Sequence, residues 1–287
     1  MPHDIEGTIT VPGGEVWYRI AGADAPGVPL LVIHGGPGAP HNYLGNLAAL
    51  ADERPVVFYD QLGGGRSSRP DDPSLWQVER FVAQLAVVRQ ALGLARINLL
   101  GQSWGAMLAV EYLLGGGKDV DHLVLSAPLL SSPLWIADQR KLLAAMPQEV
   151  QDAVVTAEAG GGYETAAYQD AVALYYQKHL CRLDPWPEPL LQTFEGLGMQ
   201  VYLTMWGPSE FTCTGTLQQA DVTPGLSGIN VPTLLTCGRY DEATPATVAQ
   251  FCRLIPDARM QIFEEASHEH HLEQPDLYLA AVREFLA

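Results

Sequence analysis

Ser103 lies within the pattern GQSWG (101–105), which is typical of a nucleophilic serine. The apolar run 97–100 predicts a strand before it, and the apolar stretch 104–114 predicts a buried helix after it. A serine on such a strand-to-helix turn is held in a strained backbone conformation that exposes its hydroxyl at the edge of the sheet. The alternative is a glycine-rich turn in which the serine only caps the helix.

The residues that could activate this serine follow it in the chain. Residues 231–237 predict an apolar strand, and the loop after this strand reaches Asp241. Residues 260–263 predict the next strand, which leads to His268 in a loop before the last helix. Parallel strands bring their carboxyl ends to one edge of a sheet, so Ser103, Asp241 and His268 should meet there. We therefore predict a nucleophile, an orienting acid and a general base, in that order along the chain.

The third component of such a site is a pair of N–H donors for the negative oxygen of a tetrahedral intermediate. The predicted strand 29–33 runs into HGGPG (34–38), where glycine lets the backbone approach a substrate closely. We assign the donors to the backbone N–H groups of Gly36 and Trp104. The alternative is a plain Gly/Pro turn, and the position of this loop directly after a buried strand argues against it.

Several other polar residues compete for these roles. His270 and His271 are rival bases, and Asp60, at the end of a predicted strand, is a rival acid that precedes the serine. His268, His270 and His271 form an H-x-H-H pattern, but no acid–histidine spacing of a metallohydrolase accompanies it. We therefore expect neither a metal nor another cofactor. His34 is expected to support its loop.

The elements that position these residues predict one α/β core with an insertion. An opening hairpin at 8–21 is followed by alternating strands and helices, which indicates a mostly parallel sheet covered by helices. The alternation is absent from 129–217, which contains helix-like stretches and no convincing strand. We predict that 1–128 and 218–287 form the α/β core. Residues 129–217 should form a helical cap subdomain over the site, with little core of its own.

The composition agrees with one large α/β domain that carries an insertion. The chain has 287 residues, of which 47% are hydrophobic and 17% are charged. The formal net charge of −17 argues against a nucleic-acid partner, and no apolar run reaches membrane-spanning length. Four scattered cysteines, no C-x-x-C pair and no secretory signal lead us to expect a reduced, cytoplasmic protein. The sequence leaves the oligomeric state open.

Five motifs distributed along the chain carry a family resemblance. They are HGGPG (34–38), DQLGGGRS (60–67), GQSWG (101–105), MWGPSEF (205–211) and GRYDE (238–242). Together they resemble the proline iminopeptidase family of α/β-hydrolases, and the resemblance covers nearly the whole chain. It implies an α/β-hydrolase fold and an enzyme that removes an N-terminal residue, often proline, from a peptide, amide or arylamide. Ala106 departs from the second glycine that the family commonly shows here, which we interpret as helix packing.

Two acidic residues need separate consideration. Glu210 lies in a mainly apolar stretch where a lone carboxylate would be costly without a partner, and Glu242 directly follows Asp241. The resemblance implies that both hold the free α-ammonium group of the substrate, whereas the alternative is that each is a solvated loop acid. The cap is also rich in aromatic residues. Of these, we expect Trp206, Phe211 and Tyr202 to line the substrate pocket.

These assignments predict two-step acyl transfer by a serine hydrolase. The substrate would be a small peptide or amino acid amide with a free N-terminal amine, and proline is the favoured first residue. One alternative is an L-amino acid amidase of broader specificity. A second is a carboxylesterase, which would not need Glu210 and Glu242. A third is a non-catalytic ligand receptor on the same fold, against which the complete set of catalytic residues argues.

Overall fold

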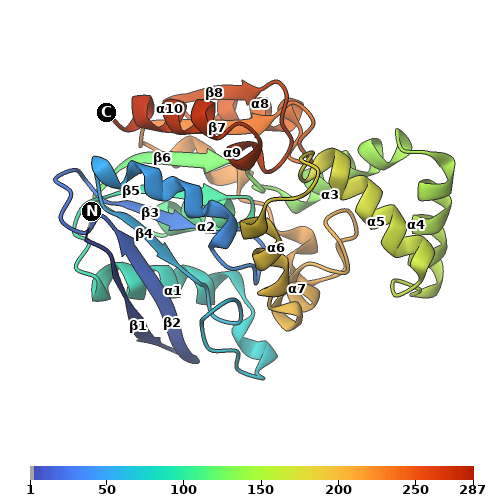
Figure 1. The fold of residues 1–287 in the computed structure, drawn as a ribbon, viewed down its shortest axis with the longest axis horizontal. Helices are drawn as coiled ribbons and strands as arrows, with labels where there is room; N and C mark the ends of the chain where they lie inside the picture. The colour runs from blue at the N-terminus through green and yellow to red at the C-terminus, as the bar shows by residue number, and fades with distance from the viewer. Residues whose placement is uncertain (1–2) are drawn as a thin grey trace.

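The computed structural model describes residues 3–287, and its centre is an eight-stranded sheet with the strand order β1-β2-β4-β3-β5-β6-β7-β8 (Figure 1). The strands are β1 Ile5–Val11, β2 Gly14–Ala21, β3 Leu30–Ile33, β4 Val56–Tyr59, β5 Ile97–Gln102, β6 Val120–Ser126, β7 Thr233–Gly238 and β8 Ala258–Phe263.

Strands β1 and β2 form the predicted antiparallel hairpin, and β2 also pairs antiparallel with β4. All remaining neighbours are parallel, so the predicted mostly parallel α/β sheet is confirmed. Successive side chains of a strand point to opposite faces. In β3, Leu31 and Ile33 belong to the core on one face, and Leu30 and Val32 belong to the core on the other.

Helices cover both faces of the sheet. Helices α1 (Val78–Ala91), α2 (Trp104–Leu114) and α8 (Pro245–Leu254) pack on one face. The other face carries η1 (Asn42–Asp52), α9 (His270–Glu273) and α10 (Pro275–Leu286). Because both faces are covered, the central strands are mostly apolar and are buried along their whole length. Three short 3-10 helices complete the core: η2 (Pro73–Leu75), η3 (Thr216–Gln219) and η4 (Thr223–Gly228).

The segment between β6 and η3 is helical. Its helices are α3 Ser132–Ala144, α4 Gln148–Gly160, α5 Ala166–His179, α6 Glu188–Glu195 and α7 Met199–Met205. Figure 1 shows α3, α4 and α5 projecting away from the sheet, with α6 and α7 nearer to it.

The cap has more of a core than the sequence suggested. An apolar cluster that includes Leu143, Val154 and Tyr175 lies among α3, α4 and α5. These helices span three or more turns each, which lets them bury apolar faces against one another. The expectation of little internal core was therefore wrong, and the exact subdomain limits, 129–217, remain a prediction. Within residues 3–287, no helix combines the length and apolar character needed to cross a bilayer.

Candidate active site

Ser103 lies on the strained turn that the sequence predicts. It joins β5 to α2 with φ 52° and ψ −119°, a conformation that residues with a Cβ rarely adopt. The glycines on either side are required by contact: a Cβ at Gly101 would collide with the carbonyl of Gly105, and a Cβ at Gly105 would collide with the carbonyl of Ile33. The Ser103 N–H donates a 2.9 Å hydrogen bond to the carbonyl of Ser126, which ties the turn to β6.

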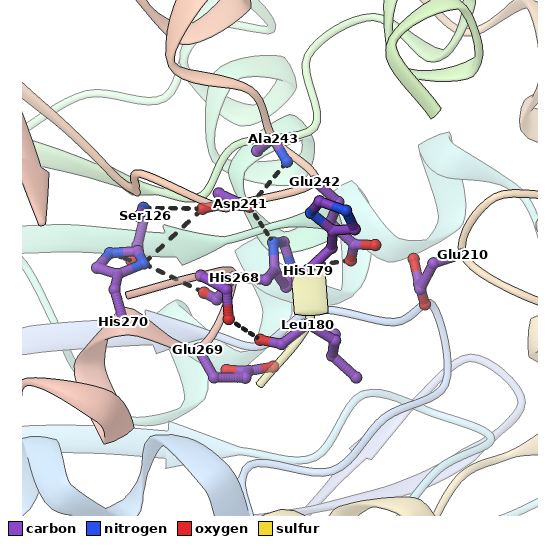
Figure 2. A network of polar contacts seen from close by, with 12 residues as sticks. Ser126, His179, Leu180, Glu210, Asp241, Glu242, Ala243, His268, Glu269 and His270 are labelled. Carbon is purple, nitrogen blue, oxygen red and sulfur yellow. Dashed lines mark hydrogen bonds and ion pairs between the residues drawn. The ribbon is translucent and has the colours of Figure 1, made fainter. Parts of the chain in front are cut away.

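Asp241 and His268 form a buried pair after β7 and β8 (Figure 2). The Oδ1 atom of Asp241 lies 2.8 Å from Nδ1 of His268. Asp241 is itself held by two backbone donors, since its Oδ1 accepts from the N–H of Ala243 at 2.7 Å and its Oδ2 from the N–H of Gly238 at 3.1 Å. Burial opposes the charged form of His268, but Asp241 and then Glu242 outweigh it and raise the histidine pKa to about 10.

Gln102 occupies the second nitrogen of His268, a contact that the sequence did not suggest. The side-chain amide nitrogen of Gln102 lies 3.0 Å from Nε2 of His268, and its Oε1 accepts a 2.5 Å hydrogen bond from the hydroxyl of Tyr43. Ser103 and His268 line the same cavity, yet within residues 3–287 the Ser103 hydroxyl makes no hydrogen bond to His268. In the resting site, Gln102 therefore occupies the hydrogen-bonding position at Nε2 of His268 that the Ser103 hydroxyl needs for proton transfer.

The two predicted oxyanion donors are free. Within residues 3–287, the N–H groups of Gly36 and Trp104 donate no hydrogen bond to the chain. Trp104 is the first residue of α2, where a helix leaves its N–H groups unpaired, and Gly36 lies in the cavity wall. His34 supports this loop as predicted: its Nε2 accepts from the N–H of Gln61 at 2.9 Å. Burial lowers the pKa of His34 to about 4.

Among the described residues, Glu242 has no basic partner within 4 Å other than His268, and Glu210 has none. Glu242 is fully buried, its Oε1 lies 3.8 Å from Nε2 of His268, and within residues 3–287 neither oxygen has a hydrogen-bond partner. Glu210 lies in the cavity wall, and its Oε1 accepts a 2.6 Å hydrogen bond from the hydroxyl of Tyr202. Burial raises the pKa of both carboxyl groups, and Glu210 raises that of Glu242 further. Such carboxyl groups are stabilised by a bound cation.

The cavity in front of Ser103 has a volume of about 220 Å³ and is walled largely by cap helices α5, α6 and α7. Of the three aromatic residues expected in the wall, Tyr202 lines the cavity. Trp206 and Phe211 do not, and the prediction for these two was wrong. Trp206 is buried edge-on against Trp135, and Phe211 belongs to the apolar cluster of the cap. Their large apolar surfaces are buried in packing behind the wall.

The rival residues have partners elsewhere. The Nε2 atom of His270 lies 2.9 Å from the hydroxyl of Thr236, and that of His271 lies 3.1 Å from the carbonyl of Tyr43. The rings of the H-x-H-H pattern thus face different parts of the fold. Asp60 accepts hydrogen bonds from two backbone N–H groups of neighbouring loops, so it stabilises the chain after β4.

Glu269 is a cavity residue that was not predicted from the sequence. It directly follows His268, lies in the cavity wall and is 4% exposed. Within residues 3–287 its Oε2 has no hydrogen-bond partner, although it lies 3.5 Å from Nε2 of His271. Burial raises the pKa of Glu269 to about 8. Its position next to the predicted base was the sequence signal that could have identified it.

The raised pKa of Glu269 predicts a pH-dependent stability. The folded pKa of about 8 exceeds the ordinary value of 4.5, so this group stabilises the fold fully below the unfolded pKa, and the contribution is lost as pH rises through 8. Wild type should lose about 1.4 kcal/mol per pH unit in this window relative to Glu269→Gln. Urea unfolding of both proteins at about pH 5 and about pH 8.5 measures the difference. Parallel stability curves would contradict the assignment.

Comparison with known proteins agrees with the fold. Residues 28–275 match the alpha/beta hydrolase fold family. The proline iminopeptidase of Heyndrickxia coagulans is 42% identical, over 98% of each chain. The solved structure of VinJ superposes with a TM-score of 0.95 at 36% identity, over 98% of each chain. The proline iminopeptidase of Mycobacterium smegmatis superposes with a TM-score of 0.91 at 36% identity, over 98% of this chain and 97% of that one.

The covered parallel sheet, the serine turn and the family match define the protein as an α/β-hydrolase. Its sequence identity of 42% to a relative over 98% of each chain is about twice the 16–22% that it shares with other solved structures of similar fold. Within the α/β-hydrolases, the chain belongs to the proline iminopeptidase family. The resemblance seen in the sequence motifs is confirmed.

Proposed function

We propose that this protein is a serine hydrolase that releases an N-terminal residue, with proline favoured, from small peptides, amides or arylamides. The observation that carries the proposal is a pair of carboxyl groups: Glu210, half-buried in the cavity wall, and Glu242, fully buried and 3.8 Å from His268. A free α-ammonium group supplies the cation that these carboxyl groups lack. Membership of the proline iminopeptidase family supports the same reading and favours proline.

The reaction begins when Gln102 releases Nε2 of His268, because the histidine must accept the proton of Ser103 there. Asp241 holds the Nδ1 side of the ring and stabilises the imidazolium that forms. Ser103 then attacks the first carbonyl carbon of the substrate. The free N–H groups of Gly36 and Trp104 stabilise the negative oxygen.

His268 next gives its proton to the leaving amine, and the first residue stays on Ser103 as an ester. A water molecule, deprotonated by His268, attacks this ester and releases the amino acid. When the ammonium group is held at Glu210 and Glu242, the carbonyl of the same first residue is placed against Ser103. The same two contacts thereby select a free amine and orient the bond that breaks.

The two other hydrolase readings use the same catalytic residues and differ in what the cavity selects. A broader L-amino acid amidase would keep the dependence on a free amine and accept side chains other than proline. A carboxylesterase would not depend on the amine. The cytoplasmic location stays a prediction, and all four cysteines are free thiols, as a reducing compartment would require.

The test is a panel of initial rates on proline, alanine and phenylalanine arylamides, N-acetyl-proline arylamide and a butyrate aryl ester. Acetylation removes the positive charge, so it should lower kcat/KM about 100-fold, as expected for the loss of a charged hydrogen bond. Glu242→Gln should mainly raise KM for the free-amine substrates and leave the acetylated substrate unchanged. Asp257→Gln, at an exposed site, is the control.

Each outcome of the panel points to one reading. Fast cleavage of the proline arylamide, lost on acetylation, supports an iminopeptidase. A preference for alanine or phenylalanine that still requires the amine replaces it with a broader amidase. Equal rates with and without acetylation, with the ester fastest, would remove Glu210 and Glu242 from substrate binding and leave an esterase.

A further inference from the structure

The cavity wall carries a second carboxyl group besides that of Glu210, and it belongs to Glu269. Glu269 is 4% exposed and forms part of the cavity wall, as do Ser103 and His268. The proposed reaction gives it no role, because Asp241 orients His268, and Glu210 with Glu242 receives the amine. A buried carboxyl group in a binding cavity is costly to maintain unless something binds it.

Glu269 has no cationic partner within residues 3–287. Its Oε2 has no hydrogen bond, and the nearest basic side chain is His271, with Nε2 at 3.5 Å. That ring is neutral, because burial lowers the pKa of His271 to about 3, and its Nε2 is already 3.1 Å from the carbonyl of Tyr43. The positive charge of the adjacent His268 lowers the pKa of Glu269, but burial outweighs it. A cationic ligand beside the unpartnered Oε2 would therefore favour the charged form of Glu269.

The position of Glu269 separates it from the amine site. Figure 2 shows Glu242 and Glu210 toward one side of His268 and Glu269 toward the other. The electrostatics agree, since Glu210 raises the pKa of Glu242 more than Asp241 does, and Asp241 more than Glu269 does. When the ammonium group of a substrate is held at Glu210 and Glu242, its reacting carbonyl lies at Ser103. The leaving group then lies beyond Ser103, on the side away from the amine site. The leaving group is also the part that His268 protonates.

We propose that Glu269 binds a cationic group on the leaving part of the substrate, such as the ammonium or guanidinium side chain of the second residue. This inference rests on the proposed aminopeptidase activity and adds a preference for a basic residue after the bond that breaks. The short charged hydrogen bond formed at Glu269 would act in addition to the contacts of the α-ammonium group. The other role for Glu269 is structural, as a neutral acid packed against His271.

The experiment compares three dipeptide amides with proline first and lysine, norleucine or Nε-acetyl-lysine second. Norleucine removes the charged group of lysine, and the acetylated form keeps the length without the charge. Each is measured with wild type, Glu269→Gln and Glu265→Gln. Glu265 lies in the same loop but is exposed, so its substitution makes the same charge change away from the cavity. Thermal unfolding of the three proteins verifies that each is folded.

Wild type should cleave the lysine substrate with a kcat/KM at least about tenfold above those of the two neutral substrates. Glu269→Gln should abolish this preference and leave the norleucine rate near that of wild type, whereas Glu265→Gln should retain the preference. An equal loss on all three substrates, or no preference for lysine in wild type, would overturn the proposal. Failure of wild type to cleave any of the three would instead count against the proposed function.

The same proteins tested on lysine and norleucine arylamides determine which side of the bond Glu269 serves. The proposal requires that Glu269→Gln leaves the ratio of these two rates unchanged. In the lysine arylamide the side-chain ammonium group belongs to the first residue, so it does not lie on the leaving side. A lysine preference on the arylamides that disappears in Glu269→Gln would overturn the assignment to the leaving side.

Discussion

Replacing Ser103 with alanine is expected to lower kcat/KM on proline arylamide by about 10⁴-fold or more. The hydroxyl is the atom that bonds to the carbonyl carbon, and no neighbouring group can take its place on this turn. The free N–H groups and the amine site would remain, so binding of the substrate should persist. Initial rates give the loss of turnover, and calorimetric titration with the uncleaved substrate gives the retained affinity.

Ser103→Gly separates the chemistry of this residue from its strain. Ser103 has φ 52°, and alanine keeps that strain because it also has a Cβ. Glycine relieves it, and after the added entropy of the unfolded chain the folded state should gain about 1 kcal/mol. The glycine variant should therefore be inactive and melt about 2 °C above the alanine variant. Normal activity in either variant would mean that Ser103 is not the nucleophile.

Asp241→Asn is expected to lower kcat by about 10⁴-fold. The Oδ1 atom of Asp241 faces Nδ1 of His268 and the N–H of Ala243, and Oδ2 faces the N–H of Gly238. An asparagine amide must turn its NH₂ group toward one of these donors. If it faces His268, the ring keeps its proton on Nε2 and cannot take the proton of Ser103.

The measurement for Asp241→Asn is the pH profile of kcat, with exposed Asp257→Asn as the matched control. Asp241 also raises the pKa of His268, so losing its charge should move the acidic limb of the profile to lower pH. The remaining activity should be small at every pH. A near-normal rate for Asp241→Asn would return Asp60 to consideration as the acid.

Several features of this protein follow from short stretches of sequence. The turn at Ser103 is one, because the carbonyl of Gly105, four residues on, requires glycine at 101. Glycine at 105 is required by the carbonyl of Ile33 in the neighbouring strand β3. The helix 104–114 was predicted with the bounds that the structure has, since apolar periodicity and the tight turn before it mark its limits. In contrast, η1 and α8 were not predicted from periodicity.

The pairing of Asp241 with His268 was also predictable, although 27 positions separate them. Parallel strands that follow one another bring their carboxyl ends to one edge, so chain order and strand order together determine which loops meet. The structure places both residues after adjacent strands β7 and β8, as this rule requires.

The walls of the cavity, by contrast, were decided by tertiary packing. Trp206 and Phe211 looked like pocket residues, but helix packing buries them behind the wall, while Glu269 lies in it. The contact of Gln102 with His268 joins residues 166 positions apart. Local sequence determines the conformation of each segment through steric contacts and periodicity. Which side chains share a cavity depends on how distant helices pack together, and no short stretch of sequence contains that information.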